Sequence, residues 1–205
     1  MDFLILAILI AIGCYALTSR DQRLRIATLG SHLSQYQIEK LMETITQGYL
    51  RALGEKDLAR QEQIWVLLNT NEGQLAEQFK RFATEFAKVT AERTRVSKIA
   101  IALPYADTLF PGSTFDVRKA FAIHAQGIAR AADTRTDTSD ATSAKNKAFM
   151  MSAELFLMQH TCHWFCKSKT VASARMVARH QTTYAQLVAA VSPETRRAYC
   201  NLVEA

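Results

Sequence analysis

The sequence predicts an all-α fold, in which a single N-terminal transmembrane helix is followed by a cytoplasmic bundle of about five to seven helices. Three observations lead to this prediction. Only 7 of the 205 residues are Gly and 3 are Pro, whereas folds built from many short strands need turns that are rich in both. Residues 3–17 are apolar without interruption. The remaining chain repeats its apolar residues mostly at helical spacing.

Residues 1–19 are predicted to anchor the chain in a membrane. The run FLILAILIAIGCYAL carries no charge, and with the next two residues it reaches the lower limit of about 17 residues for a spanning helix. A signal peptide is the main alternative, but it should have Lys or Arg before the apolar run and a small-residue cleavage site after it. Lipoprotein processing at Cys14 is a second alternative, which the apolar residues beyond Cys14 disfavour.

The basic residues Arg20, Arg23 and Arg25 directly follow the apolar run. By the positive-inside rule they place the bulk of the chain in the cytoplasm. Each of the three is also predicted to contact anionic lipid headgroups. The expected location is therefore the cell membrane, the inner membrane in a bacterium, with a single pass. Three cysteines lie outside the span, and so small and odd a number does not suit the disulfide framework of a secreted protein.

An N-terminal helical region is predicted for residues 20–131. Its helices are expected at 31–53, with Ser31 as the cap and Gly54 as the stop, at 55–69, at 72–103 and from the cap Ser113 to about 131. The sequence T-N-E-G at 70–73 predicts a turn, and Pro104 should end the third helix. Residues 99–103 alternate in a way that also suits a short strand. Capping boxes are predicted at Asn71 with Gln74 and at Ser113 with Asp116.

The third of these helices carries the clearest pattern in the chain. Its apolar residues alternate steps of four and three, interrupted by Arg93, at Leu75, Phe79, Phe82, Phe86, Val89, Val96, Ala100 and Leu103. One hypothesis is a coiled coil in which Leu75, Phe79, Phe82, Phe86 and Val89 form an association seam between chains. The other is the core stripe of an intramolecular bundle. The second is favoured, because Phe suits a two-stranded seam poorly.

Residues 132–144 are predicted to form a flexible linker or loop, because they are small and polar and lack apolar periodicity. Residues 145–205 should form a C-terminal helical region that packs on the same bundle. Its helices are expected at 148–165, at 168–191 and after Ser192-Pro193-Glu194. The helix at 148–165 is apolar enough to suggest a second span, but Glu154 and the histidines disfavour that alternative.

The segment His160, Cys162, His163 and Cys166 brings together residue types that ligate transition metals. On a helix His160 and His163 share a face with Cys166 at its edge, whereas Cys162 lies on the neighbouring face. The spacing matches neither C-x-x-C-H nor H-E-x-x-H. No cofactor is therefore predicted, and a transition metal on His160, His163 and Cys166 is kept as the alternative. The simpler expectation is that the cysteines are core residues and the histidines are hydrogen-bonded or exposed.

The net charge of +6 is mild, and it suits anionic lipid without requiring nucleic acid, for which no binding motif is present. Phosphate-binding glycine loops and the nucleophile elbow are also absent. The predicted function is therefore a membrane-anchored, non-catalytic scaffold, adaptor or accessory subunit that binds another protein or itself. The alternative is a metal- or redox-responsive protein that uses the cluster at 160–166.

Overall fold

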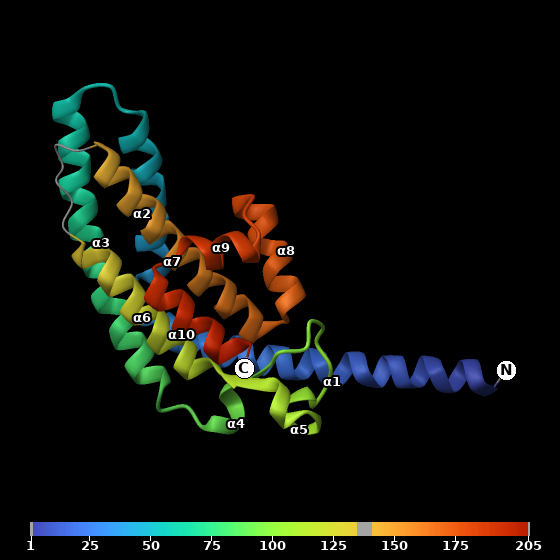
Figure 1. Ribbon diagram of the computed structural model, residues 1–205. Coiled ribbons are helices and arrows are strands. Elements are labelled where there is room, and N and C mark those ends of the chain that lie inside the picture. The colour runs from blue at the N-terminus through green and yellow to red at the C-terminus, as the bar shows by residue number, and fades with distance from the viewer. Residues whose placement is uncertain (1, 135–140, 205) are drawn as a thin grey trace.

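The computed structural model describes residues 2–134 and 141–204 and confirms the all-α prediction (Figure 1). The helices, in chain order, are α1 (Asp2–Leu33), α2 (Ile38–Gly54), α3 (Leu58–Phe86), α4 (Ala91–Thr94), α5 (Ala106–Leu109), α6 (Val117–Asp133), α7 (Ala141–Cys166), α8 (Lys169–His180), α9 (Tyr184–Ala190) and α10 (Pro193–Val203). A 3-10 turn, η1 (Pro111–Ser113), precedes the second of two short strands, β1 (Arg95–Ser97) and β2 (Thr114–Asp116).

Helix α1 projects from the body, and its N-terminal half makes no contact with the bundle (Figure 1). Residues Phe3–Leu33 are long and apolar enough to cross a membrane, with a mean hydropathy of 2.0 in the most apolar window, none of it buried. The helix does not end at residue 19. It continues past the basic residues and packs on α7 and α3, where Leu29 is buried. Ser31 therefore lies inside α1, and the next helix begins at Ile38 rather than at Ser31.

Helix α3 is continuous, so the predicted turn at residues 70–73 and the capping box at Asn71 and Gln74 are wrong. It begins after Asp57, whose carboxylate accepts hydrogen bonds from the backbone N–H groups of Ala59 and Arg60. Gly73 does not break it, because a glycine inside a long helix costs only about 1 kcal/mol relative to alanine. The packing of α3 against α2 and α6 outweighs that local cost.

The same helix ends at Phe86 instead of Leu103. Val96 then pairs with Phe115 in the antiparallel β1–β2 ladder, and both side chains are buried. The strand thus lies at 95–97, earlier than the alternative at 99–103. Asp116 alone caps α6 by accepting from the backbone N–H of Arg118, so Ser113 takes no part in a capping box there.

The core lies where α3, α6 and α7 meet, and aromatic rings fill it. Phe82 and Phe86 of α3 lie 5.2 and 5.1 Å from the ring of Phe121 on α6, between ring centroids. Phe165 at the end of α7 lies 5.9 Å from Phe86. All four rings are at most 1% exposed. Rings at these separations add edge-to-face attraction to the burial of their area.

The chain around the predicted linker is more helical than expected. Helix α6 reaches Asp133 and α7 begins at Ala141, so both ends of the 132–144 segment are helical, while residues 135–140 lie outside the described part. The predicted helix at 168–191 is divided into α8 and α9, because Gln181 adopts a left-handed backbone with φ of 51°. The last helix is confirmed, with Ser192 as its cap and Pro193 in its first turn.

Helix α7 is the central element of the body, since α1, α2, α6, α8 and α9 all pack on it (Figure 1). Within residues 2–134 and 141–204, nine helices follow α1, more than the five to seven expected. The single turns α4 and α5, which flank β1, and the division between α8 and α9 add three helices, whereas the merging of the two expected helices at 55–69 and 72–103 into α3 removes one.

Candidate functional site: the joint between the anchor helix and the body

The three arginines that follow the apolar run occupy two different environments. Arg20 and Arg23 are exposed, as residues that contact lipid headgroups would be. The side chain of Arg25 is only 15% exposed and points into the body. The predicted headgroup contact is thus proposed for Arg20 and Arg23, because the guanidinium of Arg25 is already used inside the chain.

The guanidinium of Arg25 joins α1 to β1 and to α5. Its Nε donates to Asp21 Oδ2 at 2.8 Å, and its Nη1 donates to the backbone carbonyl of Arg95 at 2.7 Å. Asp107 Oδ2 lies 3.9 Å from Nη2, and the guanidinium also stacks over the ring of Phe165 at 5.5 Å. Only a planar, forked donor can reach these partners together.

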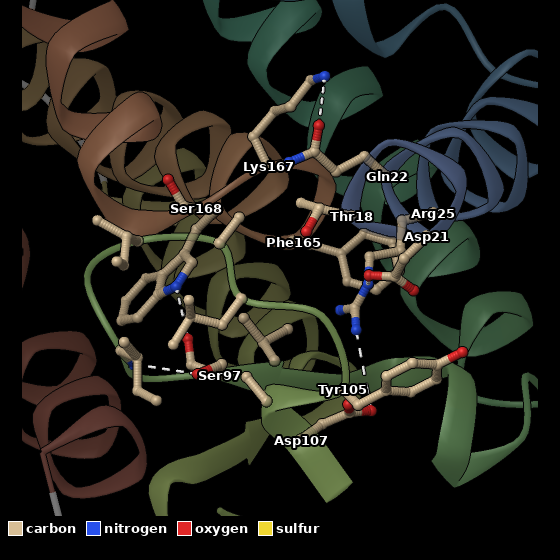
Figure 2. Close-up of a pocket in the computed structure, with 17 residues that line it drawn as sticks. Thr18, Asp21, Gln22, Arg25, Ser97, Tyr105, Asp107, Phe165, Lys167 and Ser168 are labelled. Carbon is tan, nitrogen blue, oxygen red and sulfur yellow. Dashed lines mark hydrogen bonds and ion pairs between the residues drawn. The ribbon is translucent and has the colours of Figure 1, made fainter. Parts of the chain in front are cut away.

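Two further hydrogen bonds close the joint around Arg25 (Figure 2). Lys167, just after α7, donates from Nζ to Gln22 of α1 at 2.8 Å. The indole N–H of Trp164 donates to the backbone carbonyl of Ser97 at 3.0 Å. The cavity that remains between these residues is about 40 Å³. This volume suits a few water molecules, whereas ligand pockets usually reach several hundred Å³. The joint is therefore structural rather than a substrate pocket.

The proposed association seam lies inside the bundle. Leu75, Phe79, Phe82 and Phe86 are 0% exposed and contact residues of the same chain. Val89 lies beyond the end of α3 and is half-buried against the same core. Leu75, Phe79, Phe82 and Phe86 therefore leave no surface for a second chain and form an intramolecular core stripe, whereas Val89 keeps part of its surface.

The cluster at 160–166 does not converge on one point. His160 is buried, and its Nε2 lies 3.1 Å from the hydroxyl of Ser173 on α8. His163 faces the other side of α8, where its Nδ1 accepts from Arg175 at 3.0 Å. Cys162 and Cys166 are free thiols. Among the described residues, no group of three or more His, Cys, Asp or Glu side chains is placed to hold a metal ion.

The electrostatic environment of the cluster is unfavourable to thiolate chemistry. Burial raises the pKa of Cys162 well above its usual range and raises that of Cys166 to about 11. Burial, together with Lys169 and His163, lowers the pKa of His160 to about 3. The thiols are therefore protonated and His160 is neutral near pH 7. A thiol needs a lowered pKa to be a good nucleophile, and no observation here favours the metal- or redox-responsive alternative.

Two buried polar networks were not predicted from the sequence. In the first, Glu72 of α3 accepts from the hydroxyl of Tyr49 at 2.5 Å and pairs with Lys147 Nζ at 2.8 Å. In the second, the hydroxyl of Thr161 donates to the carbonyl of Leu157, so it accepts from His124 Nε2 at 2.8 Å. The only sequence signal was the presence of charged residues at helix positions that the apolar periodicity assigns to the core, as with Glu72, three residues before Leu75.

A third feature missed from the sequence is a groove of about 580 Å³ between α2, α7 and α8. We call it the α2–α8 groove. One side carries Glu39, Lys40 and Glu43 of α2. The other carries Arg179 beside His163 and His180, whose pKa values are lowered mainly by burial. Phe156 lies at its base and stacks on the ring of His180, with centroids 3.9 Å apart. The groove joins residues more than a hundred positions apart, so no local pattern could reveal it.

Comparisons of the chain with protein-family models, with curated proteins and with solved structures find no match. Within the described residues, the features that bear on function are thus the apolar projecting helix, the joint at Arg25 and the α2–α8 groove. The first two concern attachment and the third offers a surface. None of the three places a nucleophile beside a base in a cavity, which is the arrangement that covalent catalysis requires.

Proposed function

We propose that the chain is a single-pass membrane-anchored adaptor or accessory subunit, with no reaction of its own, that binds another protein or a second copy of itself. The observation that carries the proposal is the continuity of α1. One helix provides the apolar span and then packs into the bundle, where Arg25 fixes it to the first residue of β1. A rigid helix of this kind holds the body at a fixed height and tilt beside the membrane, whereas a flexible linker would not.

The body is proposed to lie on the cytoplasmic side. Arg20 and Arg23 are exposed on α1 at the end of the apolar stretch, where they fit anionic headgroups and the positive-inside rule. Arg25 is not among these residues, because its guanidinium binds the carbonyl of Arg95 inside the chain. The cysteines are free thiols, which also suits a reducing compartment.

The α2–α8 groove is the proposed partner surface. Glu39 and Glu43, with Lys40 between them in the sequence, face Arg179 across half-buried Met42 and Phe156. The groove therefore suits a peptide or helix that carries both charges around an apolar centre. Opposed charge of this kind contributes more to partner choice and association rate than to raw affinity. The surface is rigid, because α2 and α8 both pack on α7.

The test is native mass spectrometry of the full-length protein, extracted from its own membrane in mild detergent. We expect a stoichiometric protein partner or a defined homo-oligomer. The variant Glu43→Arg should remove that species, whereas Glu62→Arg, the same charge change at an exposed site on α3 outside the groove, should leave it intact. A monomer that carries a metal or cofactor mass would refute the proposal. Equal loss in both variants would refute the assignment of the groove.

A further inference from the structure

Five large apolar side chains are exposed on the segment between β1 and β2. We call residues 99–112 the apolar loop. Its exposed members are Ile101 (58%), Leu103 (42%), Tyr105 (62%), Leu109 (66%) and Phe110 (48%). Single exposed apolar residues are ordinary on a protein surface, but a group of five on one segment indicates a surface that something covers.

The position of this loop identifies what covers it. Leu17, Arg20 and Leu24 of α1 line one shallow hollow together with Pro104, Tyr105 and Thr108 of the loop. Leu17 is the last residue of the uninterrupted apolar run. Because a helix rises 1.5 Å per residue, the hollow extends over about 10 Å along α1 from the end of the span. The loop therefore lies at the depth where hydrocarbon gives way to lipid headgroups.

The loop is held firmly although its apolar side chains face outward. The hydroxyl and backbone N–H of Thr170 both donate to the carbonyl of Ala100, at 2.7 and 3.1 Å. At its other end, the carbonyl of Ser113 accepts from the backbone N–H of Lys98 at 2.8 Å. Tyr105 adopts a left-handed backbone with φ of 57°, which costs a residue with a side chain about 1 kcal/mol or more. The fold thus fixes the loop in its exposed arrangement.

We propose that the apolar loop inserts Ile101, Leu103, Tyr105, Leu109 and Phe110 into the interfacial layer of the bilayer that α1 spans. This inference rests on the proposed membrane anchoring. Lipid is the occupant because the loop is continuous with the span at Leu17 and because an amphipathic Tyr lies at the depth where such rings are enriched. The exposed Arg20, which lines the same hollow, and the exposed Arg23 three residues further along α1 match the anionic headgroups of the same layer.

The consequence is a second point of attachment. A single helix leaves the body free to rotate about the helix axis, whereas α1 and the apolar loop together fix which face of the body meets the lipid. In Figure 1 the loop and α5 lie beside α1 where the helix leaves the body, and the turn between α2 and α3 lies at the far end of the body. Leu58 at that turn is 78% exposed and should remain in water.

The test places a tryptophan at Leu109 or at Phe110 in the full-length protein. Each variant, Leu109→Trp and Phe110→Trp, is reconstituted into vesicles of phosphatidylcholine and phosphatidylglycerol, with and without acyl-chain bromination close to the carbonyl. The emission of the unsubstituted protein is subtracted, since Trp65 and Trp164 are buried. We expect brominated lipid to reduce the added emission about twofold or more, as for an indole at the interface. The matched control, Leu58→Trp, should be unaffected.

A further variant, Tyr15→Trp, separates this inference from the anchoring on which it rests. Tyr15 lies on the exposed apolar half of α1. Quenching at position 15 without quenching at 109 and 110 would overturn the lipid contact of the loop while the anchor stands. Absence of quenching at position 15 would overturn the anchor and the loop contact together. Quenching at 58 equal to that at 109 would also overturn the inference, because the effect would then not depend on position.

Discussion

Arg25→Ala should destabilise the protein far more than the same change at Arg23, two residues earlier on the same helix. Arg25 Nη1 donates to the carbonyl of Arg95, and a hydrogen bond with one charged partner contributes about 1.5–3 kcal/mol. Stacking on Phe165 adds roughly 0.5–1 kcal/mol. The bond to Asp21 adds less than about 0.5 kcal/mol, because that carboxylate is 55% exposed. The expected loss is thus about 2–4 kcal/mol.

The assay is thermal unfolding of the full-length protein in mild detergent, followed by circular dichroism. For a chain of this size, 1 kcal/mol shifts Tm by roughly 2–4 °C, so a loss of about 2–4 kcal/mol in Arg25→Ala should lower Tm by roughly 4–16 °C. Arg23→Ala removes an exposed charge and should change Tm by no more than about 2 °C. Arg25→Lys keeps the charge but loses the fork, and should fall between the two. Equal shifts for Arg25→Ala and Arg23→Ala would refute the joint.

Three other perturbations address the buried polar groups. Lys147→Met should lower the free energy of unfolding by about 3–5 kcal/mol in urea titrations, because it leaves the carboxylate of Glu72 buried without its cation. His124→Gln should weaken the pH dependence of stability. Burial lowers the pKa of His124 to about 3 in the folded protein, so the neutral side chain contributes its full stability above about pH 6.5. That contribution is lost as the pH falls towards 3. Gly127→Ala should destabilise the fold, as judged by Tm, because a Cβ there meets the carboxylate of Glu154.

Each of these has a control within the chain. The double variant Glu72→Gln with Lys147→Met should recover most of the stability that Lys147→Met loses, since no buried charge then remains. A pH profile in His124→Gln as steep as that of the unsubstituted protein would contradict the titration of His124. Gly30 also lies inside a helix but has open space around it, so Gly30→Ala should be neutral or stabilising by up to about 1 kcal/mol. If Gly127→Ala behaved like Gly30→Ala, the steric argument would fail.

The sequence predicted those features that depend on local pattern. The apolar run, the stop at Gly54 and the Ser192-Pro193 start of α10 each have a signature within a few residues. The predicted turn at 70–73 failed because local breakers compete with packing. Glu72, which reads as a turn residue beside Gly73, is instead a buried partner of Lys147, about 75 positions away. Tertiary contacts of this kind are invisible to propensity.

The spacing of apolar residues has the same limit. The steps of four and three correctly marked Leu75, Phe79, Phe82 and Phe86 as one face of a helix, but a coiled-coil seam and an intramolecular core stripe have the same spacing. The packing of Phe121 and Phe165 against that face distinguishes the core stripe from the seam. Arg25 shows the same limit for charge. It has the sequence neighbourhood of Arg20 and Arg23, yet the helix turns it towards the carbonyl of Arg95.

The joint at Arg25 also determines what the rest of the surface can do. Because α1 continues without a break into the bundle, the proposed span fixes the height and the tilt of the body. The apolar loop lies against α1 at Leu17, so in the proposed orientation it faces the membrane and fixes the rotation as well. The α2–α8 groove is lined by neither α1 nor the loop, so it stays open to a partner when the loop is in lipid. A body attached through a flexible linker would need no such joint. The buried contact of Arg25 therefore indicates that the body, with its groove, is held in a fixed position relative to α1.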